Sequence, residues 1–301
     1  MAVVRIFDDR KRELVFGSPP KRVVSLVPSD TFTVAALGCA SALVGRTDYC
    51  ELPEEVVRAV PSVGGTKNPR IEAIVDLSPD LVIANQEENT KGDLEALAQR
   101  GVRVLVVFPK RVADGIAGMA RLARIFGVAG DPGARDLVRR GYEAIREAES
   151  ARDKCVPLRA FCPIWMDPLM TIHGDTFISD MLDLAGAKNV FADRERKYPL
   201  AADLGKAKPL GFDKVGDRDV RYPRVTLDEV CARAPEIVVL PDEPHPFSEA
   251  DADVFRALDI PAAKNGAIVR TGGKDICWYG ARSVDGLPRV RALVDEHRAP
   301  R

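Results

Sequence analysis

The chain has 301 residues, and its 44 lysines and arginines are balanced by 45 aspartates and glutamates, which gives a formal net charge of −1. This balance excludes the strongly basic surface of most nucleic-acid-binding proteins and polybasic membrane binders. With 46% hydrophobic residues the chain can bury a sizeable core, and its length predicts about two domains of roughly 150 residues. No apolar run reaches the roughly 18 to 20 residues of a membrane-spanning helix, so we expect no membrane insertion.

Short β-branched runs alternate with amphipathic stretches along the whole chain, which predicts an α/β protein with mostly parallel sheets. In the first half we expect strands at 22–27, 43–46, 81–84 and 103–108, and helices near 31–37, 71–77, 90–99 and 112–126. In the second half we expect strands at 159–165, 236–240 and 267–270, and helices near 176–184, 227–234, 250–258 and 284–297.

The two halves contain a repeated segment, because 71–84 aligns without a gap on 227–240. Each copy reads as a helix, a turn that contains proline and a buried strand. Each also has a carboxylate seven residues before its proline, Glu72 in the first copy and Asp228 in the second. We therefore predict that the halves are structural repeats of one another.

A long helix is predicted between the halves. Segment 131–154 opens with Asp131 in the N-cap position and Pro132 at the first helical position, and its apolar residues form one stripe at helical spacing. We accordingly expect three parts: an N-terminal αβ lobe at 1–130, the connecting helix at 131–154 and a C-terminal αβ lobe at 155–301.

The common catalytic motifs are absent from the sequence, which contains no G-x-x-x-x-G-K-[ST], no G-x-G-x-x-G after the first strand, no H-E-x-x-H and no G-x-S-x-G. We therefore expect that the protein is not an enzyme, and that it has no catalytic residues, no resident metal and no intrinsic cofactor. The six cysteines lack the close spacing of a zinc site or a disulfide framework. His173 and His245 lie in turn-like segments, which leaves a metal-ion site as a weaker alternative.

Five segments carry a family resemblance, and they follow one another along nearly the whole chain: PKRVVSLVPS at 20–29, VGGTKNP at 63–69 with Ile71 and Glu72, SPDLVIA at 78–84, TFISDMLDLAGAKNVF at 176–191 and YPRVTLDE at 222–229. They resemble the substrate-binding proteins of ABC importers for vitamin B12 and iron chelates, of the helical-backbone (class III) type, and most of all the cobalamin binders. The resemblance implies two αβ lobes joined by one long helix, with the ligand cleft between the lobes.

The resemblance also implies partners and a location. The protein would be a monomer in the periplasm or another extracytoplasmic space, and would deliver a metal chelate to an ABC permease dimer. In the family, one glutamate on each lobe docks onto arginines of the permease, and these positions map to Glu72 and Asp228. Asp228 is one methylene shorter than glutamate, so Glu229 is an alternative docking residue. An acid at a helix start is also favoured by the helix macrodipole, which leaves a purely structural role open.

A site for a macrocyclic chelate needs aromatic faces and a few fixed polar groups. Loops that follow parallel strands gather at one edge of a sheet, so residues in such loops can converge. The expected ligand-binding residues are Ser29, Tyr49, Thr66, Asn85, Trp165, Asp167, Tyr222, Trp278, Tyr279 and Arg282, with Asp30, Glu87 and Asp275 as further polar candidates. The family's B12 binders tend to carry tryptophan where this chain has Thr66 and Asn85, so a smaller corrinoid, haem or a siderophore complex are alternative ligands.

Segment 198–221, called the excursion below, looks like an insertion with little apolar periodicity. A loop of this length in a compact domain is usually functional or mobile. Two interpretations are open: a rim over the cleft, with Lys206, Lys208 and Lys214 offering charge to acidic groups of the ligand, or a disordered surface loop.

The amino terminus favours a rival function. Residues 1–16 carry charges throughout and lack the apolar stretch of a secretory signal peptide. A cytosolic protein that handles corrinoids or metal chelates with the same fold, as an enzyme or a sensor, is therefore the alternative to an importer component.

Overall fold

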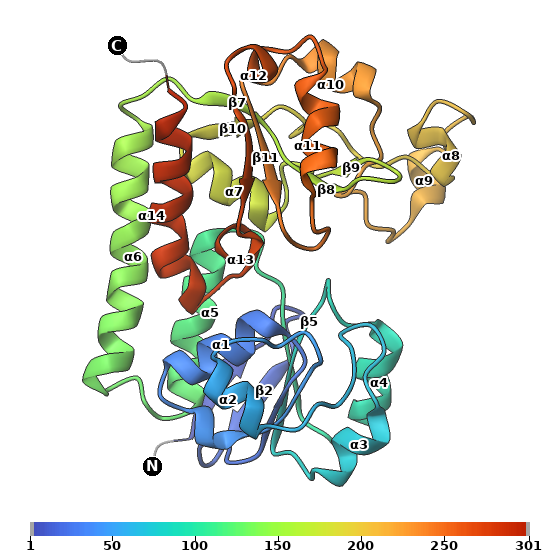
Figure 1. Ribbon diagram of the computed structural model, residues 1–301. Coiled ribbons are helices and arrows are strands. Elements are labelled where there is room, and N and C mark those ends of the chain that lie inside the picture. Colours follow the sequence, from blue (N-terminus) through green and yellow to red (C-terminus); the bar gives the residue numbers. More distant parts are fainter. Residues whose placement is uncertain (1–2, 299–301) are drawn as a thin grey trace. The chain divides into compact units, whose positions relative to one another are not determined.

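The computed structural model describes residues 3–298 (Figure 1). Contacts within the chain divide these residues into two compact units. Unit 1 comprises 3–143 together with the return segment Trp278–Val284, and unit 2 comprises 144–277 and 285–298. Among the described residues, no helix is long and apolar enough to cross a membrane.

Unit 1 is built on a four-stranded parallel sheet with the order β4-β3-β5-β6. Its strands are β3 (Val23–Ser25), β4 (Leu43–Arg46), β5 (Leu81–Asn85) and β6 (Val104–Val107). Its helices are α1 (Pro28–Ala36), the short 3-10 helix at Ala40–Ala42, α2 (Glu54–Ala59), α3 (Ile71–Asp76), α4 (Lys91–Gln99) and α5 (Val112–Ile125). All residues of β5 are buried, as expected for a central strand with a helix on each face.

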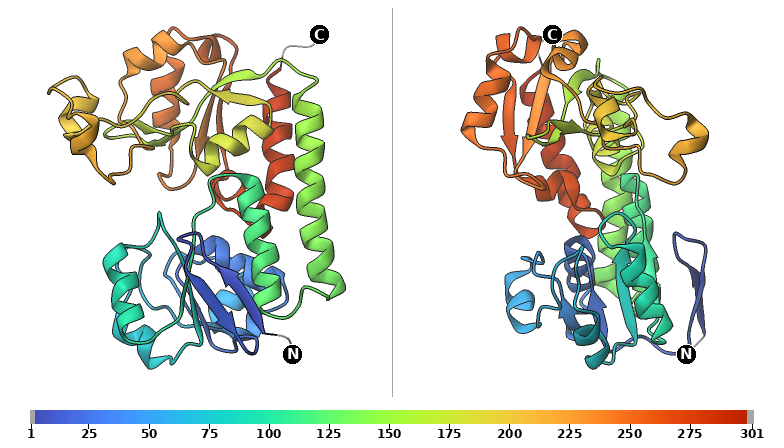
Figure 2. Two further views of the ribbon diagram at one scale, coloured as in Figure 1. Left: turned by 180° about the vertical axis from the view of Figure 1, so that it is seen from behind. Right: turned by 90° about the vertical axis from the view of Figure 1, so that its right-hand side faces the viewer.

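A β-hairpin precedes this sheet, formed by β1 (Val4–Phe7) and β2 (Glu13–Phe16). Two hydrogen bonds hold the hairpin turn in place. Asp9 N donates to Val106 O of β6, and Arg121 of α5 donates to the Asp9 carboxylate. The hairpin (dark blue) lies beside α5 in Figure 2. The sequence analysis predicts no strand here, because β1 and β2 are half-exposed strands rich in charged neighbours and lack the continuous apolar run of the buried parallel strands.

Unit 2 repeats the architecture with the strand order β10-β7-β11-β12, again all parallel. Its strands are β7 (Leu158–Phe161), β10 (Ala187–Asn189), β11 (Ile237–Pro241) and β12 (Ile268–Thr271), with a small antiparallel pair, β8 (Pro163–Trp165) and β9 (Met170–Thr171). The helices within it are α7 (Phe177–Leu184), α8 (Leu200–Asp203), α9 (Phe212–Val215), α10 (Leu227–Arg233), α11 (Glu249–Arg256), α12 (Pro261–Lys264) and α13 (Gly273–Cys277).

The predicted fold class, α/β with mostly parallel sheets, is confirmed. The single strand expected at 159–165 is two strands, because the chain leaves the parallel sheet after Phe161. Pro163, which has no N–H to donate to a ladder, begins β8. The unpredicted elements β9, β10, α2, α8, α9, α12 and α13 are two to six residues long.

The two sheets confirm the structural repeat. In each, the strand order is second, first, third, fourth. In unit 1, Asp80 N donates to Arg22 O at 2.7 Å and the Asp80 carboxylate accepts from Arg22 N. In unit 2, Glu236 N donates to Arg159 O at 2.7 Å and the Glu236 carboxylate accepts from Arg159 N. An acid at the start of the third strand therefore fixes the start of the first strand in both units.

Two helices belong to both units, α6 (Pro132–Arg152) and α14 (Ala281–Glu296). The first is the predicted connecting helix, with Ile145 and Ala148 on its buried stripe. The boundary between the units falls inside α6, at 143/144, and Trp278–Val284 lies in unit 1. The sequence analysis places all of 155–301 in the C-terminal lobe, so it does not predict that Trp278–Val284 belongs to unit 1.

Candidate functional site

The carboxyl ends of the parallel strands define a candidate ligand-binding edge in each unit. In both sheets the chain runs from the first strand to one side and later to the other, so the first and third strands lie at the point where the strand order reverses. Ligands of open α/β sheets bind at this point. The relevant loops follow β3 and β5 in unit 1, and β7 and β11 in unit 2.

In unit 1 the reversal point is filled by a residue from far along the chain. The Tyr279 hydroxyl donates to Asp30 Oδ2 at 2.7 Å, and Asn85 Nδ2 donates to the Tyr279 oxygen at 3.2 Å. All three residues are buried. The structure thus brings together Asn85 and Tyr279, both predicted ligand-binding residues, but pairs them with each other and with Asp30.

Asp30 is an unusual carboxyl group, with only 3% of its surface exposed. Burial raises its pKa from 3.8 to about 7, and the hydrogen bond from Tyr279 offsets part of this rise. Beside it lies a cavity of about 10 Å³, room for one water molecule. Asp9, Asp114 and Arg121 are among the residues that line the cavity.

Two further polar candidates of unit 1, Ser29 and Thr66, are buried. The Ser29 carbonyl accepts from Thr33 Oγ1 at 2.8 Å, and the Thr66 carbonyl accepts from Asn89 Nδ2 at 2.9 Å. Asn89 also receives the Asn85 N–H at 2.8 Å. Asn89 Nδ2 also lies 3.4 Å from Leu26 O, so Asn89 connects the loop after β5 with the loop after β3 and with the loop before α3.

Tyr49 is the exposed aromatic residue at this edge of unit 1. It lies in the loop after β4 with 63% of its surface exposed. Its ring lies against Gly65, where a Cβ atom would stand 3.4 Å from Tyr49 Cε2 and 2.3 Å from Asn68 Oδ1. One edge of the Tyr49 ring therefore lies close to the Gly65 backbone.

In unit 2 the reversal point presents an aromatic surface. Trp165 ends β8 and is 43% exposed, and its indole N–H donates to Asp167 O at 2.9 Å. Its ring centroid lies 5.3 Å from that of His245, in the loop after β11. The His245 ring in turn meets buried Phe247 edge-on at 4.6 Å. Loops after the first and third strands thus meet through ring contacts, tilted by 58° between Trp165 and His245 and edge-to-face between His245 and Phe247.

Tyr222 lies near this surface on a segment that pairs with β9. Thr171 N donates to Pro223 O, and Met170 forms an antiparallel bridge with Arg224. Because Trp165 also pairs with Met170 and paired residues share a face, Trp165, Met170 and Arg224 lie on one side of this small sheet. Tyr222 is half-buried, with the Arg221 guanidinium 5.5 Å from its ring.

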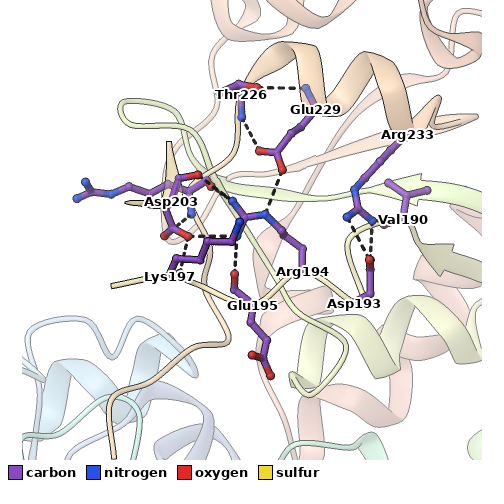
Figure 3. Close-up of polar contacts among 10 residues, drawn as sticks. Val190, Asp193, Arg194, Glu195, Lys197, Asp203, Thr226, Glu229 and Arg233 are labelled. Carbon is purple, nitrogen blue, oxygen red and sulfur yellow. Dashed lines mark hydrogen bonds and ion pairs between the residues drawn. The ribbon is translucent and has the colours of Figure 1, made fainter. Parts of the chain in front are cut away.

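The excursion is anchored to unit 2 by one buried arginine (Figure 3). Arg194 Nη1 lies 3.1 Å from Asp203 Oδ1, and its Nη2 donates to the backbone oxygens of Asp203 and Arg224. Arg194 Nε lies 3.1 Å from Glu229 Oε1, and the other Glu229 oxygen accepts from Thr226 N. The excursion contains α8 and α9 and projects from the rest of unit 2 (yellow, Figure 2).

The predicted docking acids differ in their surroundings. Glu72 is exposed in the first turn of α3 and pairs with Arg100. Asp228 is exposed in the first turn of α10. Glu229 caps the same helix and binds Arg194, so its carboxylate is engaged within unit 2.

The remaining candidates lie apart from these clusters. Trp278 is buried on α1, with its ring 6.2 Å from Phe32, and belongs to unit 1. Asp275 pairs with Arg289 at 2.7 Å. Asp167 and the three lysines of the excursion are exposed, and Arg282 is half-buried. The backbone N–H of Glu87 donates to Asn85 Oδ1. His173 Nδ1 accepts from the backbone N–H of Asp175.

No metal-binding group is formed by the side chains of residues 3–298, where three or more His, Cys, Asp or Glu nowhere come together in a suitable cluster. The six cysteines are free thiols. Sequence reasoning missed Arg194 and Asp203, which lie in a charged stretch typical of solvated loops. It considered His245 only as a metal ligand, whereas its ring contacts the Trp165 ring in a tilted arrangement.

Comparison with known proteins agrees with this architecture. The chain is 25% identical over 223 residues to the vitamin B12-binding protein of Yersinia pestis (strain Pestoides F), which covers 73% of this chain and 69% of that protein. Among solved structures, the periplasmic vitamin B12 binding protein of Vibrio cholerae superposes with a TM-score of 0.72 at 19% identity, over 94% of this chain and 99% of the other.

A second solved structure, the periplasmic haem-binding protein from Roseiflexus sp. RS-1 in its apo form, also gives a TM-score of 0.72 at 19% identity, over 93% and 99% of the two chains. At these identities the structures establish the shared fold. A family model described as periplasmic binding protein matches residues 23–273. Because this match covers most of the chain, the protein belongs to the periplasmic binding protein family.

Proposed function

We propose that this protein is the substrate-binding component of an ABC importer, and that its ligand is a corrinoid or another metal chelate such as haem or siderophore iron. The observation that carries the proposal is the exposed Trp165 ring, held by its own indole hydrogen bond and backed by His245 at the reversal point of the unit 2 sheet. Family membership and relatives named for vitamin B12 and haem support the same ligand class.

Exposed aromatic rings give each unit a flat surface that suits a planar ligand. A large aromatic ring that stays exposed while its N–H is satisfied offers a fixed face of low conformational entropy, which suits a rigid planar ligand. Tyr49, which lies close to Gly65, offers a second exposed aromatic ring in unit 1. By the family resemblance, B12 binders tend to carry tryptophan at the positions of Thr66 and Asn85, both of which are buried here. We therefore keep a smaller corrinoid, haem and a siderophore complex as alternative ligands to cobalamin.

The proposed role is capture and delivery without catalysis, by a monomer that has no intrinsic cofactor and works outside the cytoplasm. The family description supports this role. The proposed partner is a permease dimer, which Glu72 and Asp228 contact through the first turns of α3 and α10. Exposed ion pairs contribute only about 0.2 to 1 kcal/mol each, so these acids orient docking rather than determine its strength.

A spectral titration tests the proposal. Apo-protein is titrated with cyanocobalamin, dicyanocobinamide, haem and a ferric siderophore, and the ultraviolet–visible spectrum of each chelate reports binding. We expect a saturable shift with at least one of them, and recovery of the chelate unchanged. No binding of any chelate at micromolar concentration would contradict the ligand class, and a chemically altered chelate would favour an enzyme.

Variants locate the binding surface. Trp165→Ala should weaken binding of the active chelate. Tyr142→Ala is the matched control, because Tyr142 is also an exposed aromatic residue, at 38%, but lies on α6 away from the strand ends. Equal affinity of the two variants would contradict a role for the Trp165 surface.

A further inference from the structure

The return segment Trp278–Val284, called the strap below, has a position unlike that of its neighbours in the chain. It belongs to unit 1, whereas the residues before and after it belong to unit 2. It lies on α1, where Ala281 N donates to Thr33 Oγ1 at 3.1 Å. Gly280 has a φ of +71°, and a Cβ atom there would stand 2.5 Å from the same Thr33 oxygen. This contact therefore needs glycine.

The strap covers one buried acid. Tyr279 places its hydroxyl 2.7 Å from Asp30 Oδ2, so the bond that the strap gives to this carboxyl group comes from a neutral donor. A carboxylate loses favourable hydration when it is buried, and a neutral hydroxyl restores only part of that loss. The seated strap thus favours the protonated form of Asp30.

The charged groups near Asp30 do not reverse this preference. Arg121 of α5 lowers the pKa of Asp30, but Arg121 also pairs with Asp9 at 2.7 Å, and Asp9 raises it. Asp114 of α5 lines the same cavity, and its carboxylate accepts from the backbone of Lys110 and Arg111. The groups that face Asp30 are Thr33 from its own helix, Tyr279 from the strap, Arg121 and Asp114 from α5, and Asp9 from the hairpin turn. Asn85 from β5 contacts the Tyr279 hydroxyl.

We propose that the strap is a pH-sensitive latch on unit 1, which stays seated while Asp30 is protonated and lifts more readily once Asp30 is ionised. Lifting the strap removes Tyr279 and admits water to the carboxylate. It also unwinds the first turn of α14, which begins at Ala281. The inference rests on unit 1 alone and does not depend on the identity of the ligand.

The direction of the pH effect follows from linkage. In the seated state the pKa of Asp30 is raised from 3.8 to about 7, and in the lifted state it returns toward the ordinary value. The seated state therefore binds the proton more tightly, and a rise in pH between these values favours lifting. Each pH unit within the window increases the opening constant by up to about tenfold, and the increase ends above the seated-state value.

Hydrogen exchange measured by mass spectrometry tests the latch. The exchange of peptides that cover 278–284 is followed in the full chain between pH 5 and pH 9, and each rate is divided by the intrinsic rate at that pH. We expect protection of the strap to fall as the pH rises to about 7 and then to level off. Asp76→Asn, which removes an exposed acid of the same unit, should behave like the wild type.

Two variants separate the latch from general loss of stability. Asp30→Asn removes the titrating group, so its strap protection should not change with pH. Tyr279→Phe keeps the carboxyl group but removes the bond that lowers its pKa, so the fall in protection should move to higher pH. Wild-type protection that does not change with pH would overturn the proposal. So would an unchanged fall in Asp30→Asn, or in Tyr279→Phe a midpoint that stays in place or moves to lower pH.

Discussion

Arg194 and Asp203 form an ion pair that is almost completely shielded from water, with 3.1 Å between Nη1 and Oδ1 and exposed side-chain fractions of 9% and 0%. Asp203 also accepts the N–H groups of Lys197 and Arg224. The pair thereby joins α8, the start of the excursion, to the segment that leads into α10. Of the two interpretations left open by the sequence, the loose surface loop is wrong for this part of the excursion.

Removing the carboxylate should be costly. Asp203→Ala leaves a buried guanidinium with Glu229 as its remaining acid, and we expect the free energy of unfolding to fall by about 3 kcal/mol, the lower end of the range for a broken buried pair. Urea unfolding followed by circular dichroism measures the change. Asp213→Ala, an exposed acid in α9, serves as the control. A loss below about 0.5 kcal/mol, typical of surface substitutions, would contradict the structural role of the pair.

Asp30 predicts a specific pH dependence of global stability. Its pKa is raised from 3.8 to about 7 in the folded state, so the folded state binds the proton more tightly than the unfolded state. This contribution to stability is complete below pH 3.8 and is lost as the pH rises toward 7, by up to about 4 kcal/mol. Asp30→Asn should therefore be more stable relative to the wild type at pH 8 than at pH 5. Unfolding curves that keep a constant difference would refute this.

Gly280 should not tolerate a side chain. Gly280→Ala forces a residue with a φ of +71° and a Cβ atom 2.5 Å from Thr33 Oγ1, and we expect a loss of about 1 to 3 kcal/mol in the free energy of unfolding. Gly118→Ala lies inside α5 with no atom within 4 Å of the added Cβ, so it should gain about 0.5 to 1 kcal/mol. Thermal unfolding compares the two variants. Equal shifts in Tm would contradict the close contact.

The docking acids should separate binding from delivery. Asp228→Lys reverses an exposed charge in the first turn of α10, so it should reduce chelate-stimulated ATPase activity of the reconstituted permease while chelate affinity stays unchanged. Glu229→Ala should instead lower stability, because Glu229 holds Arg194. Full stimulation by Asp228→Lys would argue against docking at this position.

The sequence predicts well those features that depend on local pattern. The buried run of β5 and the repeated helix, proline and strand at 71–84 and 227–240 are readable because each element carries its own periodicity. The matching bonds of Arg22 with Asp80 and of Arg159 with Glu236 show that the repeat extends to the first strand. The predicted ligand cleft between the lobes stays a prediction.

Features that depend on distant contacts are not readable in this way. Tyr279 bonds to Asp30, 249 positions away, and no local pattern distinguishes a buried tyrosine of this kind from one that faces a ligand. The same holds for Glu229, whose pairing with Arg194 depends on how the chain returns to α10. Residue type identified the candidates, but tertiary structure decides which of them are available to bind.

The fluorescence of Trp165 during a chelate titration tests the central claim most directly. The chain has two tryptophans, and Trp278→Phe removes the buried one, so the emission of this variant comes from Trp165. Haem, dicyanocobinamide and cyanocobalamin absorb light and quench a nearby indole. We expect at least one of them to quench the emission and to reach saturation together with the shift in its own absorption spectrum. A saturable absorption shift without quenching, or no response at micromolar concentrations of every chelate, would contradict the account.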